Sequence, residues 1–536
     1  VEKVWDFTTG SSAISVGVVD TGIAYHDDLN PNYTDDWAID FCEAPIWQEP
    51  EFYTKNDRDY HGTHVAGIIG AAGNNGEGVT GVNWNVNLVQ LKVFNFKIEN
   101  YKEHNNILNY AINYAAETLN PYYEMERIRI LNMSIYKLHA NYKIDQAVQN
   151  YVNAGGLLVC ISGNMALNLD ENRGLEQAVK LGMIYPNNII VVGSIDKNNE
   201  RGINSNWGED SVDIYAPGVD VLSTVPLQWC LDNSTDKHYA NGYHYETGTS
   251  MAAPHVSGVA ALLLSINPNL TAGQIKECII YGADTITITV GDGTTQNVKK
   301  LNAWGAFKYL MNNYYNSYSS VGYDDDIQIT DSIDADGDYF DDHTSLIRVK
   351  LENTGDYTFT VSANNAIDVK LYDMEFNEIS VTQIKSNSNS NVEFTLSGER
   401  LFYLRTNFVD VSSAGTITVD VDAPSSHVHS YTQYVNYSNT LHIEACECGA
   451  LGTQKSPHVI REGSAVNKRA FCLQCGALVL LGDGFGETPI LNLTKVTLNG
   501  SYILPNGIIV LVDEDVEAYL NGTLVFYNKD DLPVTQ

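Results

Sequence analysis

The regular alternation of short apolar runs with amphipathic segments over residues 1–315 is the feature that most constrains the fold. Almost continuous apolar runs lie at 14–19, 87–93, 128–133, 157–161 and 189–192, and segments with helical spacing at 65–72, 107–119 and 144–154 separate them. Strands that are apolar on both faces are typical of a parallel sheet covered by helices on either side. We therefore predict an α/β domain with a parallel sheet flanked by helices for residues 1–315.

The rest of the chain has a different composition and predicts three further parts. Residues 320–424 contain short segments with period-two alternation, such as 346–351 and 417–421, which predict a β-sandwich. Residues 425–480 hold a cluster of cysteines and histidines, which predicts a module similar to a zinc ribbon. Residues 481–536 show the pattern of a β-rich C-terminal segment. We expect all-β accessory domains after the α/β domain.

Charge argues against a nucleic-acid partner, and hydropathy argues against a transmembrane segment. The 536 residues include 31 basic and 66 acidic side chains, a formal net charge of -35. Because contacts with phosphates need a basic surface, we expect no nucleic-acid partner. No apolar run approaches the length that crosses a bilayer, and the longest, around 259–266, fits a buried helix. We therefore expect no transmembrane segment.

Three short motifs place reactive side chains at the ends of predicted elements. Asp20 follows the first apolar run, His61 begins a helix rich in small residues, and Ser250 begins an apolar helix. In a parallel sheet the strand ends and the helix starts share one edge, where ligands bind. A serine nucleophile needs an imidazole to take its proton, and the imidazole needs a carboxylate to orient it. The three residues can form a catalytic triad, although each motif alone also fits a turn, a helix start or a cap.

The order Asp, His, Ser, within Asp-Thr-Gly, His-Gly-Thr-His-Val-Ala-Gly and Gly-Thr-Ser-Met-Ala-Ala-Pro-His, resembles the subtilisin-like serine proteases. The resemblance implies a subtilisin-like fold and hydrolysis of peptide bonds through an acyl-enzyme on Ser250. It implies that His61 is the base and Asp20 orients it. Asn164, in Ser-Gly-Asn after the run 157–161, matches the oxyanion-hole asparagine of the family. By the same resemblance, the other histidines of these motifs support the core.

The resemblance also implies a substrate groove. In this family the substrate pairs as an extra strand with the segment that corresponds to Ser134, Ile135 and Tyr136, and Gly163 borders the same groove. The family usually has glycines where this segment ends, whereas Tyr136 and Lys137 stand there in this sequence. Cleavage specificity therefore stays open.

A structural calcium site follows from the resemblance as well. The segments 26–29 and 73–79 resemble the strong calcium site of the family. Oxygen ligands for Ca²⁺ would come from the side chains of Asp28 and Asn75 and from the carbonyls of Gly73, Glu77 and Val79. A plain surface turn is the alternative for this loop.

The cysteine and histidine cluster reads as two divergent copies of one unit, at 429–449 and 458–476, each with a histidine before a close cysteine pair. Tetrahedral Zn²⁺ favours ligands from such pairs, so we predict a zinc site. Two disulfides are the alternative. The predicted ligands are Cys446, Cys448, Cys472 and Cys475, with His429 or His458 as substitutes.

The segment that ends at residue 421 resembles the small β-sandwich domain found after secreted bacterial peptidases. This resemblance implies a secreted bacterial endopeptidase that acts on protein or peptide substrates, with C-terminal modules that attach it to a cell surface or a substrate. Two alternatives stay open. The α/β domain could be a scaffold in a surface-binding protein, or the chain could be a processing enzyme that matures one partner protein.

Overall fold

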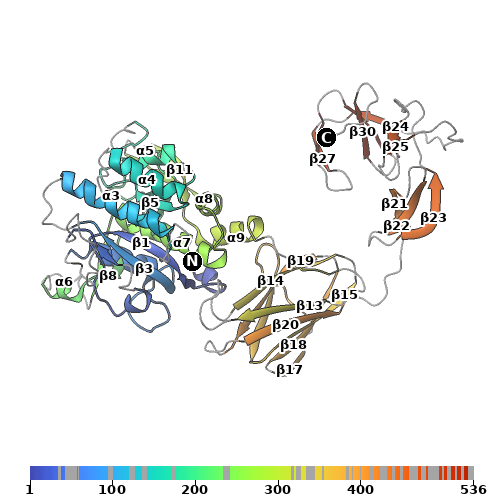
Figure 1. Ribbon diagram of the computed structural model, residues 1–536, viewed down its shortest axis with the longest axis horizontal. Coiled ribbons are helices and arrows are strands. Elements are labelled where there is room, and N and C mark those ends of the chain that lie inside the picture. Colours follow the sequence, from blue (N-terminus) through green and yellow to red (C-terminus); the bar gives the residue numbers. More distant parts are fainter. Residues whose placement is uncertain are drawn as a thin grey trace.

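A computed structural model describes most of the first 422 residues and, beyond them, the backbone of the strands (Figure 1). The described residues are 1–33, 38–42, 57, 59–94, 101–119, 127–135, 142–171, 177–232, 242–291, 293–315, 319–321, 327–333, 344–352, 355–381, 385–388, 390–398, 400–409, 415–422, 431–436, 441–446, 451–457, 469–471, 478–480, 494–497, 500–503, 509–512, 516–520 and 524–528.

A nine-stranded sheet forms the centre of the N-terminal domain, in the order β10-β11-β7-β6-β5-β4-β1-β3-β2. Its strands are β1 (Gly10–Asp20), β2 (Ile39–Asp40), β3 (Asn85–Lys92), β4 (Ile128–Met133), β5 (Leu157–Ile161), β6 (Ile189–Ile195), β7 (Ile214–Pro217), β10 (Asp284–Thr289) and β11 (Thr295–Lys300). All neighbouring pairs are parallel except β10 and β11, which form an antiparallel hairpin. The predicted parallel sheet is confirmed.

Helices cover both faces of this sheet (Figure 1). The helices of the described chain are α1 (Glu2–Trp5), α2 (His61–Gly70), α3 (Tyr101–Thr118), α4 (Tyr142–Asn153), α5 (Gln177–Ile184), α6 (Leu227–Asp232), α7 (Thr249–Ile266), α8 (Ala272–Tyr281), α9 (Ala303–Asn313) and the 3₁₀ helix η1 (Asn30–Asn32). α2, α7, α8 and α9 share one apolar core, and α3, α4 and α5 pack into a second core on the opposite face. The three helices predicted from spacing are therefore confirmed.

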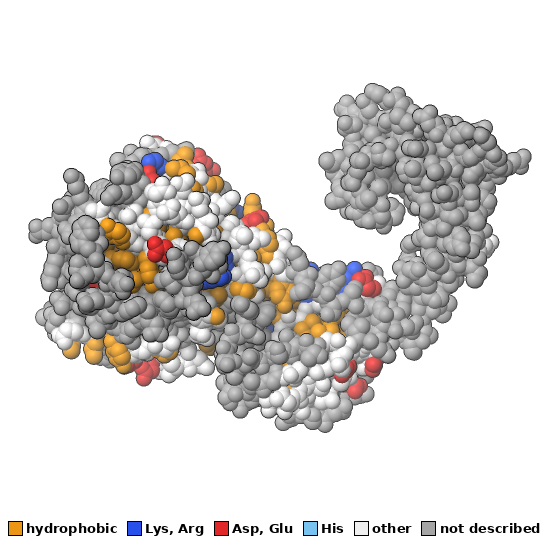
Figure 2. All heavy atoms as spheres, in the orientation of Figure 1, with side chains coloured by type: hydrophobic (Ala, Val, Ile, Leu, Met, Phe, Trp, Pro, Cys, Tyr) orange, Lys and Arg blue, Asp and Glu red, His pale blue; other side chains and the backbone are white. Residues whose placement is uncertain are grey.

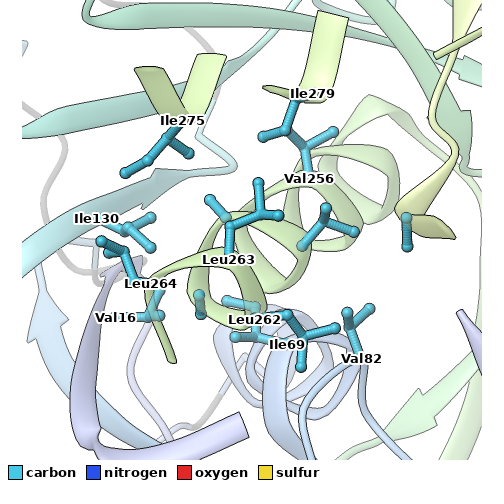
Figure 3. Packing of buried hydrophobic residues seen from close by; sticks show 14 of the residues in the cluster. Val16, Ile69, Val82, Ile130, Val256, Leu262, Leu263, Leu264, Ile275 and Ile279 are labelled. Atoms are coloured by element: carbon cyan, nitrogen blue, oxygen red, sulfur yellow. The ribbon is translucent and has the colours of Figure 1, made fainter. Parts of the chain in front are cut away.

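α7 is the central helix of the first core (Figure 3). Its residues Val256 and Leu263 are buried together with Val16 of β1 and Ile275 of α8. Among the described helices, α7 has the length and apolar composition to cross a bilayer, but 94% of that window is buried inside the protein. It is the core helix that the apolar run at 259–266 predicted.

The strand order changes direction at β1, because β3 follows it on one side and β4 on the other. A crevice forms at the carboxyl ends of the strands at such a switch point, and ligands bind there. Asp20 is the last residue of β1, and Ser134 follows the end of β4. The topology alone thus places two of the predicted site residues at one crevice.

Two sheets between residues 319 and 422 pack face to face around a separate apolar core. One has the order β12-β14-β19-β16 and the other β13-β20-β15-β18-β17. The strands are β12 (Ser319–Val321), β13 (Ile327–Ile333), β14 (Thr344–Leu351), β15 (Asp356–Ala363), β16 (Ile367–Tyr372), β17 (Lys385–Ser388), β18 (Asn391–Ser397), β19 (Arg400–Phe408) and β20 (Gly415–Asp422).

The sandwich contacts the N-terminal domain through aromatic rings. Phe7 lies 5.0 Å from Phe307 of α9 and 5.1 Å from Tyr372 of β16, measured between ring centroids. The Tyr403 hydroxyl of β19 donates to the carbonyl of Met311, and the Tyr315 hydroxyl donates to the carbonyl of Leu346. One apolar core therefore runs from the N-terminal segment through α9 into the sandwich.

Beyond residue 422, the described segments are short β-strands in small antiparallel sheets. They are β21 (Tyr431–Asn436), β22 (Leu441–Cys446), β23 (Leu451–Pro457), β24 (Arg469–Phe471), β25 (Leu478–Leu480), β26 (Thr494–Thr497), β27 (Gly500–Ile503), β28 (Ile509–Val512), β29 (Val516–Leu520) and β30 (Leu524–Asn528). The β-rich character of the C-terminal region is confirmed, while the domain boundaries stay predictions.

On the described surface in Figure 2, the basic side chains stand apart from one another.

Candidate active site

Asp20 presents a buried carboxylate at the end of β1. Its side chain is fully buried, and Oδ1 accepts a hydrogen bond from its neighbour Thr21 N at 2.8 Å. The same oxygen lies 2.7 Å from Nδ1 of His61. Because a carboxylate only accepts, Nδ1 carries the proton, and Nε2 of the neutral ring is left as the acceptor.

His61 is the first residue of α2, and two side chains satisfy the free N–H groups of this helix start. The Thr21 hydroxyl accepts from Gly62 N at 2.8 Å, and Asp57 Oδ2 accepts from Thr63 N at 2.9 Å. A Cβ on Gly62 would lie 2.1 Å from the carbonyl oxygen of Gly22, so only glycine allows this approach of helix to strand end. The Asp-Thr-Gly and His-Gly-Thr-His motifs are thus packed directly against each other.

Ser250 is the second residue of α7 and is 8% exposed. Its hydroxyl donates to the carbonyl of Ser134 at 3.0 Å, and the Ser134 hydroxyl donates to the carbonyl of Ser250 at 2.9 Å. Within the described part of the chain, the Ser250 hydroxyl therefore bonds to Ser134 and not to the imidazole of His61. Catalytic hydrogen bonds often form only when substrate is bound, and here rotation of the hydroxyl away from Ser134 is required.

Asn164 follows β5, and its amide oxygen is anchored to the start of α7. Oδ1 accepts from Thr249 N at 2.9 Å and from the Thr249 hydroxyl at 3.0 Å. A Cβ placed on Gly248 would lie 3.4 Å from Asn164 Nδ2 and 3.7 Å from Ser250 N. Two N–H donors therefore border the same small space, and two such donors can stabilise an oxyanion.

The structure describes three of the four substrate-binding residues that the resemblance implied. Ser134 is buried, Ile135 is half-buried, and Gly163 is buried with φ 96. These three lie at the ends of β4 and β5, beside Ser250 and Asn164. Tyr136 lies outside the described residues.

The electrostatics of the site centre on His61. Burial lowers the pKa of its imidazole, but the charge and hydrogen bond of Asp20, together with the charges of Asp57 and Asp59, outweigh burial and raise the pKa to about 9. The His61 side chain keeps 27% exposure, so solvent still reaches it. Burial also raises the pKa of Asp57, although four donors satisfy its oxygens.

The other motif histidines support the fold, as the resemblance implied. His64 is fully buried, and its Nε2 donates to the carbonyls of Val221 and His244 at 3.1 and 3.0 Å. Burial lowers the pKa of His64 to about 3, so the ring is neutral. His255 is half-buried and donates from Nδ1 to Met251 O at 2.8 Å. Burial lowers the pKa of His255 to about 4.

The expected calcium loop surrounds a buried carboxylate. Asp28 is fully buried, and it accepts from Asn75 Nδ2 at 2.7 Å, from Val79 N at 2.9 Å and from the Tyr243 hydroxyl at 2.8 Å. No cationic side chain among the described residues pairs with Asp28. The loop borders a cavity of about 380 Å³.

The donor set of this loop suits a hard cation. A buried carboxylate without a cationic partner, an amide and the carbonyls of a loop are oxygen ligands of the kind that Ca²⁺ prefers. Of the predicted ligands, Asn75, Glu77 and Val79 line one cavity. Asp28 accepts hydrogen bonds from Asn75 and Val79, and Gly73 precedes these residues in the same loop.

The predicted zinc ligands cannot be compared with the structure. Cys448, Cys472 and Cys475 lie outside the described residues, and Cys446 ends β22 without a described side chain. In the N-terminal domain, Cys160, Cys230 and Cys278 are free thiols.

Sequence reasoning missed three residues that hold the site. Asp57 accepts from a free N–H group at the start of α2, and the Tyr243 hydroxyl donates to Asp28. Asn206 holds the loop after β5, because its side chain donates to Ser162 O and accepts from the N–H groups of Met165 and Leu167. The one signal for Asp57 is that it is an acidic residue shortly before a helix, although Tyr60 and not Asp57 occupies the cap position. No comparable signal marks Asn206 or Tyr243, because their contacts join segments far apart in the chain.

An α/β sheet with a carboxylate, an imidazole, a serine and an anchored amide at its carboxyl edge is typical of serine hydrolases. The sequence profile of the Subtilase family matches residues 11–307, more than half of the chain. The chain belongs to this family. The predicted subtilisin-like fold and its helix-flanked parallel sheet are thereby confirmed.

Relatives of known name resemble the N-terminal domain. The chain is 31% identical over 309 residues to the thermophilic serine proteinase of Bacillus sp. strain AK1, in a match that covers 58% of this chain and 65% of that protein. It is 30% identical to thermitase of Thermoactinomyces vulgaris, over 57% of this chain and 92% of that protein. The solved structure of a cold-adapted subtilisin-like serine proteinase is 25% identical, with a TM-score of 0.42, over 55% of this chain and 90% of that chain.

Proposed function

We propose that this protein is a serine endopeptidase that hydrolyses peptide bonds of protein substrates through an acyl-enzyme on Ser250. The observation that carries the proposal is the 2.7 Å bond between Asp20 and His61 at the carboxyl edge of the sheet, beside the start of the helix that carries Ser250. Membership of the Subtilase family and relatives named as serine proteinases support it.

In the proposed reaction, a substrate chain pairs with the segment at Ser134 and Ile135, and the Ser250 hydroxyl turns from the Ser134 carbonyl to His61 Nε2. The hydroxyl proton moves to Nε2 while Oγ bonds to the scissile carbonyl carbon. Asn164 Nδ2 and Ser250 N donate to the resulting oxyanion.

The second half of the cycle reverses these roles. His61 gives its proton to the leaving amine as the carbon–nitrogen bond breaks, which leaves an ester on Ser250. A water molecule then gives a proton to His61 and attacks the ester carbonyl, and Ser250 leaves with that proton. Asp20 orients the ring and stabilises the imidazolium in both halves.

Ca²⁺ in the Asp28 loop is part of the proposal. Asp28, Asn75 and the carbonyls of Gly73, Glu77 and Val79 would hold it, and the ion would supply the positive charge that the buried carboxylate lacks. Zinc bound by Cys446, Cys448, Cys472 and Cys475 is proposed on spacing alone. Metal content measured on the purified protein by mass spectrometry tests both ions.

We also propose that the protein is a secreted bacterial protein and that its C-terminal modules attach it to a cell surface or a substrate. The resemblance of residues 320–421 to the accessory domains of secreted peptidases supports secretion. Fractionation of a producing culture, followed by immunoblotting of medium, wall and cytoplasm, tests the location.

The test of the peptidase function compares the full chain with Ser250→Ala on a mixed peptide pool, with and without a calcium chelator. We expect new N-termini only with the unsubstituted protein, and slower or absent cleavage after chelation. Equal cleavage by both proteins would refute the mechanism.

A further inference from the structure

α6 lies in the connection between β8 (Val221–Thr224) and β9 (Tyr243–Glu246), which form a two-stranded hairpin. The end of β8 next to this connection is bonded to α2, because the Ser223 hydroxyl donates to His64 O at 2.7 Å and the Thr224 hydroxyl to Thr63 O at 2.9 Å. After β9 the chain enters α7, which carries Ser250. The hairpin thus connects the helix of the proposed base with the helix of the proposed nucleophile, and Figure 1 shows α6 at its outer end.

Tyr60 directly precedes His61 and has a left-handed backbone, with φ 76. This conformation is uncommon for a residue with a large side chain, and it persists only where the surroundings hold it. The backbone of Tyr60 is tied at both ends, because its N–H donates to Asp57 Oδ1 at 3.0 Å and its carbonyl accepts from His64 N at 3.0 Å.

The ring of Tyr60 packs against α6. Its centroid lies 4.1 Å from that of Trp229, with an angle of 37° between the planes. Trp229 also lies 5.5 Å from the His244 ring of β9. Trp229 is half-buried, whereas Leu227 and Leu231 of the same short helix are 54% and 59% exposed. Of these three, the tryptophan is the residue that α6 buries toward the start of α2.

Because His61 follows Tyr60 in the chain, a change in the Tyr60 backbone angles would redirect the Cα–Cβ bond of His61. The stack with Trp229 is made with Tyr60 in its left-handed conformation, so it adds to the interactions that favour this conformation. The hydrogen bond between His61 and Asp20 holds the far end of the same ring. Two independent restraints therefore act on the imidazole, one through Asp20 and one through Tyr60.

We propose that Trp229 is a positioning residue of the peptidase, which stacks on Tyr60 and thereby keeps the His61 imidazole aligned between Asp20 and Ser250. This inference rests on the proposed peptidase function. The ring contacts of Trp229 in the described chain are with Tyr60 and His244, and in this proposal it acts on His61 through the backbone of Tyr60.

The test measures kcat and KM of Trp229→Ala and Trp229→Phe on a peptide substrate, with Leu231→Ala as the matched control on α6. A displaced base slows the chemical step, so we expect Trp229→Ala to lower kcat by roughly tenfold to a hundredfold with little change in KM. Trp229→Phe keeps a ring against Tyr60 and should restore most of the rate. Leu231→Ala should match the unsubstituted protein.

Tyr60→Gly provides the decisive comparison, because glycine adopts a left-handed backbone without help from a stack. If Trp229 acts through Tyr60, Trp229→Ala should lower kcat much less in the Tyr60→Gly background than in the unsubstituted protein. An undiminished loss in that background, or a rise in KM with kcat unchanged, would overturn the inference.

Two further measurements separate the possible failures. Circular dichroism and the thermal midpoint of each variant show whether it folds, and Trp229→Phe keeps the test valid if Trp229→Ala does not fold. If Ser250→Ala cleaves as well as the unsubstituted protein, the proposed function itself fails. If cleavage requires Ser250 but Trp229→Ala has unchanged kcat, only the positioning role fails.

Discussion

Replacement of Asp20 by asparagine should change both the rate and its pH dependence. Asp20 provides the largest contribution that raises the pKa of His61, and burial of the ring opposes it. The rise of the His61 pKa from its ordinary value of 6.5 to about 9 corresponds to roughly 3 kcal/mol in favour of the imidazolium. Because the base must be neutral, kcat/KM of the unsubstituted protein should increase about tenfold per pH unit below pH 9 and level off above it.

In Asp20→Asn the charge of the carboxylate is lost while burial of the His61 ring remains, so the acid limb, the pH below which the residual activity falls, should move down from about 9. The rate at high pH should fall by roughly 10⁴, the loss found for the equivalent change in another serine protease, because the asparagine amide favours the wrong tautomer. Initial rates on a fluorogenic peptide between pH 5 and 11 measure both effects. Asp59→Asn, which removes a smaller contribution, should shift the limb less in the same direction.

The interaction between Asp20 and His61 should also make the free energy of unfolding depend on pH. Because the pKa of His61 is higher in the folded protein than in the unfolded chain, its ion pair stabilises the fold below about pH 6.5, and this contribution disappears as the pH rises through about 9. The difference in unfolding free energy between the unsubstituted protein and Asp20→Asn should shrink over that interval. An acid limb that stays near pH 9 in Asp20→Asn would refute the assignment of the limb to this pair.

Three more predictions test other parts of the structure. In Gly248→Ala the added methyl group has no neighbour closer than 3.4 Å, so the thermal midpoint should not change. The methyl group would lie between the two oxyanion donors, Asn164 Nδ2 and Ser250 N, so kcat should fall roughly a hundredfold. At a hundredfold excess over its Kd, Ca²⁺ in the proposed site should add about 2.7 kcal/mol to the free energy of unfolding and so raise the thermal midpoint. Asp28→Asn should abolish this increase, whereas Tyr243→Phe should only reduce it. Phe7→Ala should lower the free energy of unfolding, measured with denaturant, by about 3–5 kcal/mol, because Phe7 is 2% exposed among rings of both domains. Limited proteolysis should then cleave between the N-terminal domain and the sandwich more readily.

The central sheet was predictable because its strands are apolar on both faces. The runs at 128–133 and 157–161 coincide with β4 and β5, and the motif residues Asp20, His61 and Ser250 lie at the strand and helix ends expected for them. The periodicity of a strand or helix is local information, and the parallel topology brings such ends to one edge.

Contacts between distant segments were not predictable. The stack of Trp229 on Tyr60 joins positions far apart in the chain, and nothing in the composition of either segment indicates it. The same holds for Phe7, whose apolar character gave no sign that it packs against the sandwich as well as α9. Such contacts depend on tertiary packing that a single sequence does not encode in any local pattern.

Labelling with a serine-directed fluorophosphonate, mapped by peptide mass spectrometry, tests the central claim most directly. The account predicts a single adduct on Ser250 in the folded protein, a rate of labelling that falls steeply in His61→Ala, and no adduct after denaturation. Labelling of Ser250 at the same rate with and without the His61 imidazole, or an adduct on a different serine, would contradict it.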